Sequence, residues 1–355
     1  MKRALPIRGF CILLLSAFLM LPVSLQAQDE FFTSFRTVGL TLNPAEAGRI
    51  TSLARFTAVG RTQWNRVSGE PYQSVYAGLE TQPFCLEGGN FIGASVSAAR
   101  EESGSSQFQR LNAQLGFSYH QKLEADVYLA GGAEFGLINH RLGNEDLRFD
   151  EQFDGMQYDP GLSNGEEFLR FTVTQPNATA GVLLYHRQGW WSFGAAVDHL
   201  LTPSLSFLEE NAYNLGMGLV VHGNVQLTGK KQPKVITGFQ GMYRRYSLFN
   251  TRQWHAVLGG YGVFALGRQP RNDLLSPFLR FDLSARIAGS AGTAGILNDA
   301  ILLTTTLQQN GWQFGLTYDV NLSRLSRATD GAGGLEFFLG IPIAGEPTCV
   351  FCPSF

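Results

Sequence analysis

The residues with the clearest chemical potential are cysteines. The chain has four in 355 residues, and Cys349 and Cys352 have the C-x-x-C spacing of redox motifs and of half a zinc site. No second pair of ligands and no βαβ pattern accompanies them, so we favour a disulfide formed in an oxidising compartment. The bond could join Cys349 to Cys352, or join one of them to Cys85. We predict the bond to Cys85, because a C-x-x-C loop is strained outside a helix terminus.

A second candidate is the acidic stretch 144–167, which carries eight acids and one arginine. Clustered Asp and Asn oxygens could hold calcium. Their spacing does not match an EF-hand loop, so we favour a solvated outer loop and keep calcium as the alternative. The sequence lacks the G-x-S-x-G, P-loop and H-E-x-x-H motifs. We therefore expect no enzyme and no cofactor, since the histidines are also scattered: His120, His140, His186, His199, His222 and His255.

The N-terminus indicates where the protein is sent. Lys2 and Arg3 precede an apolar run over 11–23, and Ala27 is a small residue at a cleavage position. We interpret residues 1–27 as a secretory signal peptide. Beyond it, no apolar run approaches the roughly 20 residues of a spanning helix. The formal net charge of −2 argues against a nucleic-acid partner.

The elements that must position these residues are predicted to be β-strands. In 110–120, every second side chain from Leu111 to Tyr119 is apolar, and the side chains between them are polar or glycine. Strands of more than ten residues with one uniformly apolar face are typical of outer-membrane β-barrels. A soluble β-sandwich is the alternative, but strands in soluble proteins average about 5–6 residues.

Fourteen such strands can be counted. An even number suits a barrel with both ends in the periplasm, and connections after even-numbered strands, such as Asn310–Gly311, are the short ones. We predict an all-β transmembrane barrel of about 14 antiparallel strands over residues 49–344, followed by a periplasmic tail, 345–355. The strands are expected near 50–60, 71–81, 90–100, 108–120, 123–137, 169–187, 190–200, 213–228, 234–244, 253–266, 276–288, 299–309, 312–320 and 334–343.

The face of these strands opposite the apolar one carries charges of both signs. Opposite charges in a barrel of about fourteen strands can pair across the lumen. This favours a narrow or plugged interior over a wide water channel. We expect these side chains to face the lumen: Arg110, Glu124, Asp126, Glu134, Arg280, Asp282 and Arg286.

Several stretches together resemble the PorP/SprF family of the type IX secretion system. They are "QDEFFTSF…LTLNPAEAG" (28–48), "GRTQW" (60–64), an acidic stretch (149–167), and two later segments (176–207 and 315–341). In one departure, Glu46 stands where that family commonly has an aromatic residue. The resemblance points to these motif residues: Phe31, Phe32, Phe35, Asn43, Pro44, Gly48, Arg61, Gln63 and Trp64.

The resemblance implies a fourteen-stranded outer-membrane barrel related to FadL-like transporters. It also implies a role in secreting or attaching surface proteins, including gliding adhesins, that carry a type IX C-terminal signal. The implied partners are such a secreted protein, or its C-terminal domain, and a periplasmic, peptidoglycan-associated component of the same system. No relative is known as an enzyme.

Two questions remain open at this point. Residues 28–48 are expected to fold from the periplasmic side into the barrel as a plug, with Asn43-Pro44 turning the chain toward the first strand. A periplasmic tail packed on the rim is the alternative. For function, we favour a non-enzymatic adaptor that holds a secreted partner. A FadL-like channel for a hydrophobic small molecule is the second choice, although inward Arg280, Asp282 and Glu124 argue against it, and an outer-membrane enzyme is the third.

Overall fold

The structure is a computed structural model of the chain. It describes residues 32–65, 71–103, 108–143, 150–153, 155–159, 161–162, 170–207, 214–227, 235–246, 253–266, 277–289, 297–323 and 326–343.

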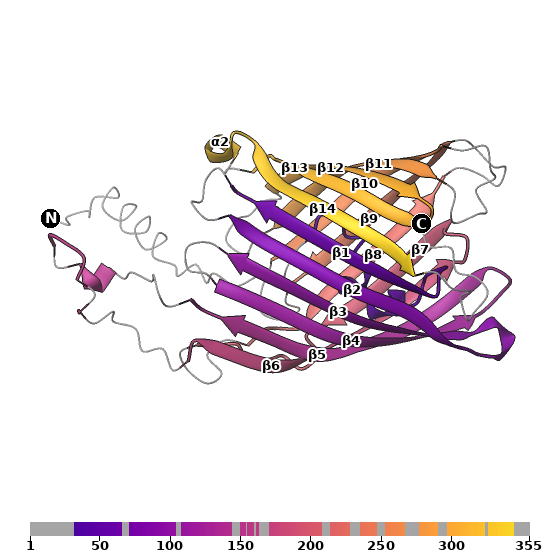
Figure 1. Ribbon diagram of the computed structural model, residues 1–355, viewed down its shortest axis with the longest axis horizontal. Coiled ribbons are helices and arrows are strands. Elements are labelled where there is room, and N and C mark those ends of the chain that lie inside the picture. The colour runs from indigo at the N-terminus through magenta and orange to yellow at the C-terminus, as the bar shows by residue number, and fades with distance from the viewer. Residues whose placement is uncertain are drawn as a thin grey trace, which may run out of the picture.

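The described residues form a closed barrel of fourteen strands, which confirms the predicted fold (Figure 1). Each strand pairs antiparallel with its neighbours in sequence, and β14 closes on β1 with Ile343 opposite Ala54. The strands are β1 (Ala54–Gln63), β2 (Tyr72–Cys85), β3 (Phe91–Ser103), β4 (Phe108–Lys122), β5 (Val127–Arg141), β6 (Thr172–His186), β7 (Trp191–Asp198), β8 (Gly218–Gln226), β9 (Val235–Arg245), β10 (Trp254–Ala265), β11 (Phe278–Gly289), β12 (Leu297–Gln309), β13 (Trp312–Asn321) and β14 (Ala332–Ile343).

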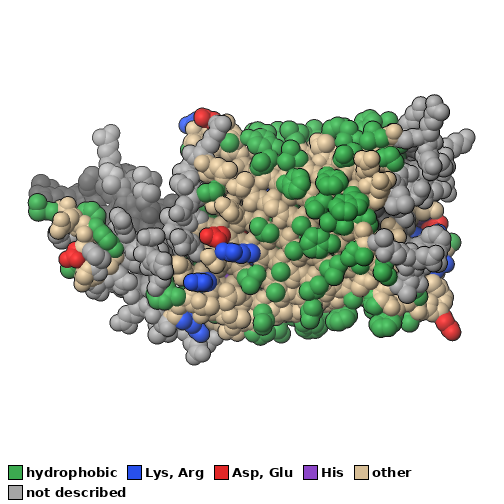
Figure 2. Space-filling model, in the orientation of Figure 1, with side chains coloured by type: hydrophobic (Ala, Val, Ile, Leu, Met, Phe, Trp, Pro, Cys, Tyr) green, Lys and Arg blue, Asp and Glu red, His purple; other side chains and the backbone are tan. Residues whose placement is uncertain are grey.

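The barrel is apolar outside and polar inside, as the period-two pattern predicts. On β4, Phe117 and Leu115 are 60% and 58% exposed, whereas Arg110 is only 2% exposed. Hydrophobic side chains cover much of the wall in the view of Figure 2, and charged side chains lie toward its two ends. An outward apolar band flanked by polar ends is what a barrel needs in order to sit in a lipid bilayer.

Several strand boundaries differ from the prediction by a few residues, among them the end of β2 at Cys85 and the start of β8 at Gly218, and two of the differences have a clear cause. The first strand begins at Ala54 rather than near residue 50, because residues 49–53 carry the chain out of the lumen and into the wall. The fourth strand continues to Lys122, so the turn comes at residues 123–126 instead of 121–122. The alternating pattern runs on through this turn, which is why the sequence alone misplaced it.

The connections follow the predicted length pattern with exceptions. Asn310–Gly311 forms the predicted two-residue hairpin, and both residues have positive φ, 53° and 80°, as a type I′ turn requires. The connection 142–171, after β5, is long as expected. However, 104–107 after β3 is short and 266–277 after β10 is longer than a simple turn. Length alone therefore does not assign every connection to a side of the membrane.

Residues 32–50, which we call the inner segment, lie against the inward face of the wall. The segment contains two short 3-10 helices, η1 (Gly39–Thr41) and η2 (Pro44–Glu46). The second helix contacts β4, β5 and β6, while the start of the segment bonds to β13 and β14 on another part of the wall. Among the described helices, none has the length and apolar character needed to cross a membrane.

Candidate functional site in the barrel lumen

The inner segment is held at its start by two carboxylates. The backbone N–H groups of Thr33 and Ser34 donate to the Glu336 carboxylate at 2.7 and 2.9 Å, and the Ser34 hydroxyl donates to the same group. The Thr33 hydroxyl donates to Asp319 Oδ1 at 2.9 Å. Hydrogen bonds to charged groups are stronger than neutral ones, so β13 and β14 fix this end of the segment firmly.

Arg61 of the G-R-T-Q-W motif completes this arrangement. Its Nη2 lies 2.8 Å from Asp319 Oδ2 and its Nη1 lies 3.4 Å from Glu336 Oε2, and all three side chains are buried. Arg286 Nη1 also lies 3.1 Å from Asp319 Oδ2. We call Arg61, Asp319, Glu336 and Arg286 the lumen charge cluster. Removing one partner of a buried ion pair typically costs about 3–5 kcal/mol, because the other charge is left buried and unpaired, so loss of Arg61 would weaken the hold on the inner segment.

The other two residues of that motif have different surroundings. Gln63 Oε1 accepts a hydrogen bond from Arg61 Nη2 at 2.9 Å, which places it beside the cluster. Trp64 follows the end of β1 with φ of 60°, and its ring packs edge-on against Tyr72 at 4.8 Å between centroids. The motif thus contributes a lumen anchor and an aromatic contact at one end of the barrel.

Asn43 and Pro44 form a buried corner in the inner segment. Pro44 opens η2, and Asn43 before it is extended, with φ −160° and ψ 116°, as the residue before a proline prefers. The Asn43 side chain accepts from the Ala45 N–H at 3.0 Å and donates to the Val182 carbonyl at 2.8 Å. Asn43 therefore caps the short helix and ties it to β6.

Gly48 lies near the end of the inner segment, at a position where no larger residue fits. Its φ is +76°, and a Cβ there would lie 2.6 Å from Gly93 Cα in β3. The Gly48 N–H donates to Glu80 Oε2 at 3.1 Å. Gln82 Nε2 donates to the carbonyls of Gly48 and Ile50, at 2.6 and 2.9 Å. The backbone polar groups at this end are satisfied by β2 side chains.

The aromatic residues at the start of the segment are buried. Phe32 packs edge-on against Tyr76 of β2, with 6.0 Å between ring centroids. Phe35 lies in a cluster with Leu42 and Met242. Phe31 lies outside the described residues. The two described phenylalanines pack inside the barrel, which fits the plug hypothesis, while any effect of the segment on passage through the barrel stays a prediction.

Five of the seven expected lumen charges line the lumen, in three places. Arg280 and Asp282 pair with each other on β11 at 2.6 Å, and Arg286 belongs to the lumen charge cluster. Arg110 and Glu134 line a second, small cavity of about 40 Å³.

Glu124 and Asp126 do not face the lumen, contrary to our expectation. They lie in the turn 123–126, where Glu124 is exposed. Asp126 Oδ1 accepts from Arg187 Nε, at 3.0 Å, in the neighbouring turn. These two acids therefore belong to the rim of the barrel, since β5 begins only at Val127.

Sequence reasoning missed three residues that matter to the site. Asp319 and Glu336 hold the inner segment, and Arg36 points into the main cavity. Asp319 and Glu336 are the charged residues of two predicted strands that are otherwise apolar or neutral. Both stand at inward positions of the period-two pattern, so the sequence did indicate that they face the lumen. Arg36 lies in an irregular segment and gave no such signal.

Two further sequence candidates are only partly described. Cys85 is disulfide-bonded, but the other cysteines, Cys349 and Cys352 among them, lie outside the described residues. The pairing of Cys85 therefore stays a prediction. Much of the acidic stretch 144–167 also lies outside them, so the calcium alternative stays open.

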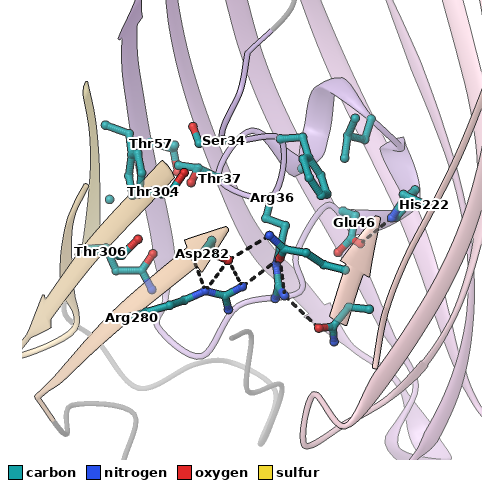
Figure 3. Close-up of a pocket in the computed structure, with 18 of the residues that line it drawn as sticks. Ser34, Arg36, Thr37, Glu46, Thr57, His222, Arg280, Asp282, Thr304 and Thr306 are labelled. Atoms are coloured by element: carbon teal, nitrogen blue, oxygen red, sulfur yellow. Dashed lines mark hydrogen bonds and ion pairs between the residues drawn. The ribbon is translucent and has the colours of Figure 1, made fainter. Parts of the chain in front are cut away.

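The main cavity lies between the inner segment and the wall and has a volume of about 160 Å³ (Figure 3). Arg36 extends into it, with Arg280 and Asp282 on one side and Glu46 and His222 on the other. The lining also includes Arg55, which lies near the start of β1, and Phe278, which is the first residue of β11. Both strands begin at the barrel end where β14 finishes, so the cavity lies in that half of the lumen.

Comparison with known proteins decides the family. The model of the type IX secretion system membrane protein PorP/SprF matches residues 24–340, nearly the whole chain. The chain belongs to the PorP/SprF family. With its closed fourteen-stranded barrel, this PorP/SprF protein is placed in the cell outer membrane. No curated protein matches the chain.

Solved structures share the barrel with this PorP/SprF protein at low sequence identity. The CymD monoaromatic hydrocarbon channel is 9% identical with a TM-score of 0.50, and the match covers 91% of this chain and 96% of CymD. A Pseudomonas aeruginosa FadL homologue is 10% identical with a TM-score of 0.45, covering 84% and 91%. At such identity the likeness concerns the fold alone.

Proposed function

We propose that this protein is a non-enzymatic outer-membrane component of the type IX secretion system that receives or anchors a secreted surface protein. Membership of the PorP/SprF family carries this proposal. The partner is an adhesin or similar protein bearing a type IX C-terminal signal. On the periplasmic side, a peptidoglycan-associated component of the same system links the barrel to the rest of the machinery.

The filled lumen supports a role as receptor rather than as conduit. The inner segment and the inward side chains leave a main cavity of about 160 Å³ in the described part of the barrel. A cavity of about 150 Å³ holds a single benzene molecule, so this space is far too small for a polypeptide. A secreted protein would therefore be held by the outer connections rather than threaded through this barrel.

A channel for a hydrophobic small molecule is the second candidate, because CymD shares the fold. The main cavity argues against it, since four arginines and three acids line it: Arg36, Arg49, Arg55, Arg280, Glu46, Glu80 and Asp282. A hydrophobic molecule gains little from a space with so many charged groups.

The proposal is tested by crosslinking in the native outer membrane, followed by purification of the tagged protein. We expect a protein with a type IX C-terminal signal to be enriched. A matched variant lacking residues 201–212, a connection predicted to face outside, is expected to lose most of that enrichment while still folding as a barrel. Failure to enrich any protein with that signal would contradict the proposal.

A further inference from the structure

The main cavity contains one more positive charge than negative charge among its arginines and acids. Three of its acids each pair with one arginine of the lining. Glu46 pairs with Arg49 at 3.0 Å, Glu80 with Arg55 at 2.8 Å, and Asp282 with Arg280 at 2.6 Å. Four arginines against three carboxylates leave a net charge of +1, and the arginine left over is Arg36.

Arg36 has only neutral hydrogen-bond partners among the described residues. Its Nη1 donates to Asn224 Oδ1 at 3.0 Å and to Gln240 Oε1 at 3.4 Å. Its guanidinium carbon also lies 5.9 Å from the centre of the Tyr261 ring, which Arg280 approaches to 4.0 Å. The Nε and Nη2 groups of Arg36 have no partner in the described part of the chain, so donors remain free.

The electrostatic surroundings of Arg36 are unfavourable to its own charge. Burial, together with the charge of Arg280, lowers the pKa of Arg36 to about 10. The guanidinium still remains charged near neutral pH. Asp282 offsets this only in part, because it pairs directly with Arg280 and not with Arg36. An anion that enters the cavity and contacts Arg36 would relieve the remaining cost.

The rest of the cavity favours an anion with an apolar part. Phe35, Leu42 and Leu302 line it, and they belong to one buried cluster. The volume of about 160 Å³ suits a molecule the size of one aromatic ring. A bare inorganic anion would leave these apolar side chains without a contact. Figure 3 shows Arg36 reaching into this space from the inner segment.

We propose that the main cavity is a binding site for a small organic carboxylate. The carboxylate group accepts hydrogen bonds from the free guanidinium donors of Arg36, and the apolar part of the ligand packs on Phe35, Leu42 and Leu302. Arginine presents paired donors that match the geometry of a carboxylate. This site is independent of the protein partner proposed above.

The test compares three probes on the purified mature protein in detergent. Benzoate has the carboxylate and a ring, benzamide has the ring without the charge, and acetate has the charge without the ring. By calorimetry, we expect benzoate to bind about tenfold or more tightly than either of the others, because only benzoate satisfies both halves of the cavity. Equal binding of benzoate and benzamide, or no benzoate binding at about 10 mM, would overturn the proposal.

A variant pair assigns the site to Arg36. Arg36→Met is expected to weaken benzoate binding about tenfold or more. Arg100→Met is the matched control, because Arg100 is exposed, pairs with Glu102 and does not line the cavity. Unchanged benzoate affinity in folded Arg36→Met protein would refute the assignment. Should that variant fail to fold, the probe comparison on the parent protein decides the question without it.

Discussion

Removing Arg61 should loosen the inner segment without opening the barrel. In Arg61→Met, the alkyl stem is kept and the guanidinium is lost. Glu336 then loses its one arginine partner in the lumen charge cluster, while Asp319 keeps Arg286 at 3.1 Å. The backbone N–H groups of Thr33 and Ser34 still donate to Glu336, so the segment keeps part of its anchor.

The magnitude follows from these contacts. Breaking a buried ion pair by removing one partner costs about 3–5 kcal/mol, and we expect the lower end because Asp319 remains paired. A loss of about 3 kcal/mol corresponds to roughly a hundredfold rise in the population of the open segment. The strands of the wall keep their backbone hydrogen bonds and should not change.

Hydrogen–deuterium exchange measured by mass spectrometry is the assay. Peptides covering residues 32–50 should exchange roughly a hundredfold faster in Arg61→Met than in the parent protein, and peptides from β4 and β5 should exchange as before. Arg100→Met is the control, since its partly exposed pair is worth at most about 1 kcal/mol. Unchanged exchange of the inner segment in Arg61→Met would refute the claim that the cluster anchors it.

Three further predictions concern topology, passage and the disulfide. Deleting residues 28–48 should leave a folded barrel with raised single-channel conductance in planar bilayers, and unchanged conductance would favour a segment packed on the rim. A tag in 201–212 should be labelled on intact cells and a tag in 228–233 should not; the reverse pattern would invert the topology. Peptide mapping without reduction should link Cys85 to the C-terminal tail, 345–355, and a free Cys85 thiol would defeat this.

The barrel was predictable because its physical cause is local. Apolar side chains must alternate with polar ones wherever a strand separates lipid from lumen, so each strand can be recognised from its own stretch of sequence. Strand boundaries were misplaced for a clear reason in two places. In the turn 123–126 the alternation continues by chance, and residues 49–53 carry the chain from the lumen into the wall instead of forming part of a strand. Most strands could therefore be located without knowing which strands lie beside them.

The candidate site was less predictable because its contacts are distant in sequence. Arg61 and Asp319 are 258 positions apart, and nothing local pairs them. The inward position of Asp319 could be read from the alternation, but its partner depends on how the closed barrel places β1 near β13. Arg36 depends on the path of an irregular segment, which no repeating pattern describes.

The central claim is that this barrel receives or anchors a secreted protein carrying a type IX C-terminal signal. The most direct measurement is the surface proteome of cells that lack this protein, compared with cells in which it is restored. The account predicts that at least one protein with that signal disappears from the cell surface and returns on restoration. A surface that keeps every such protein in its usual amount would contradict the account.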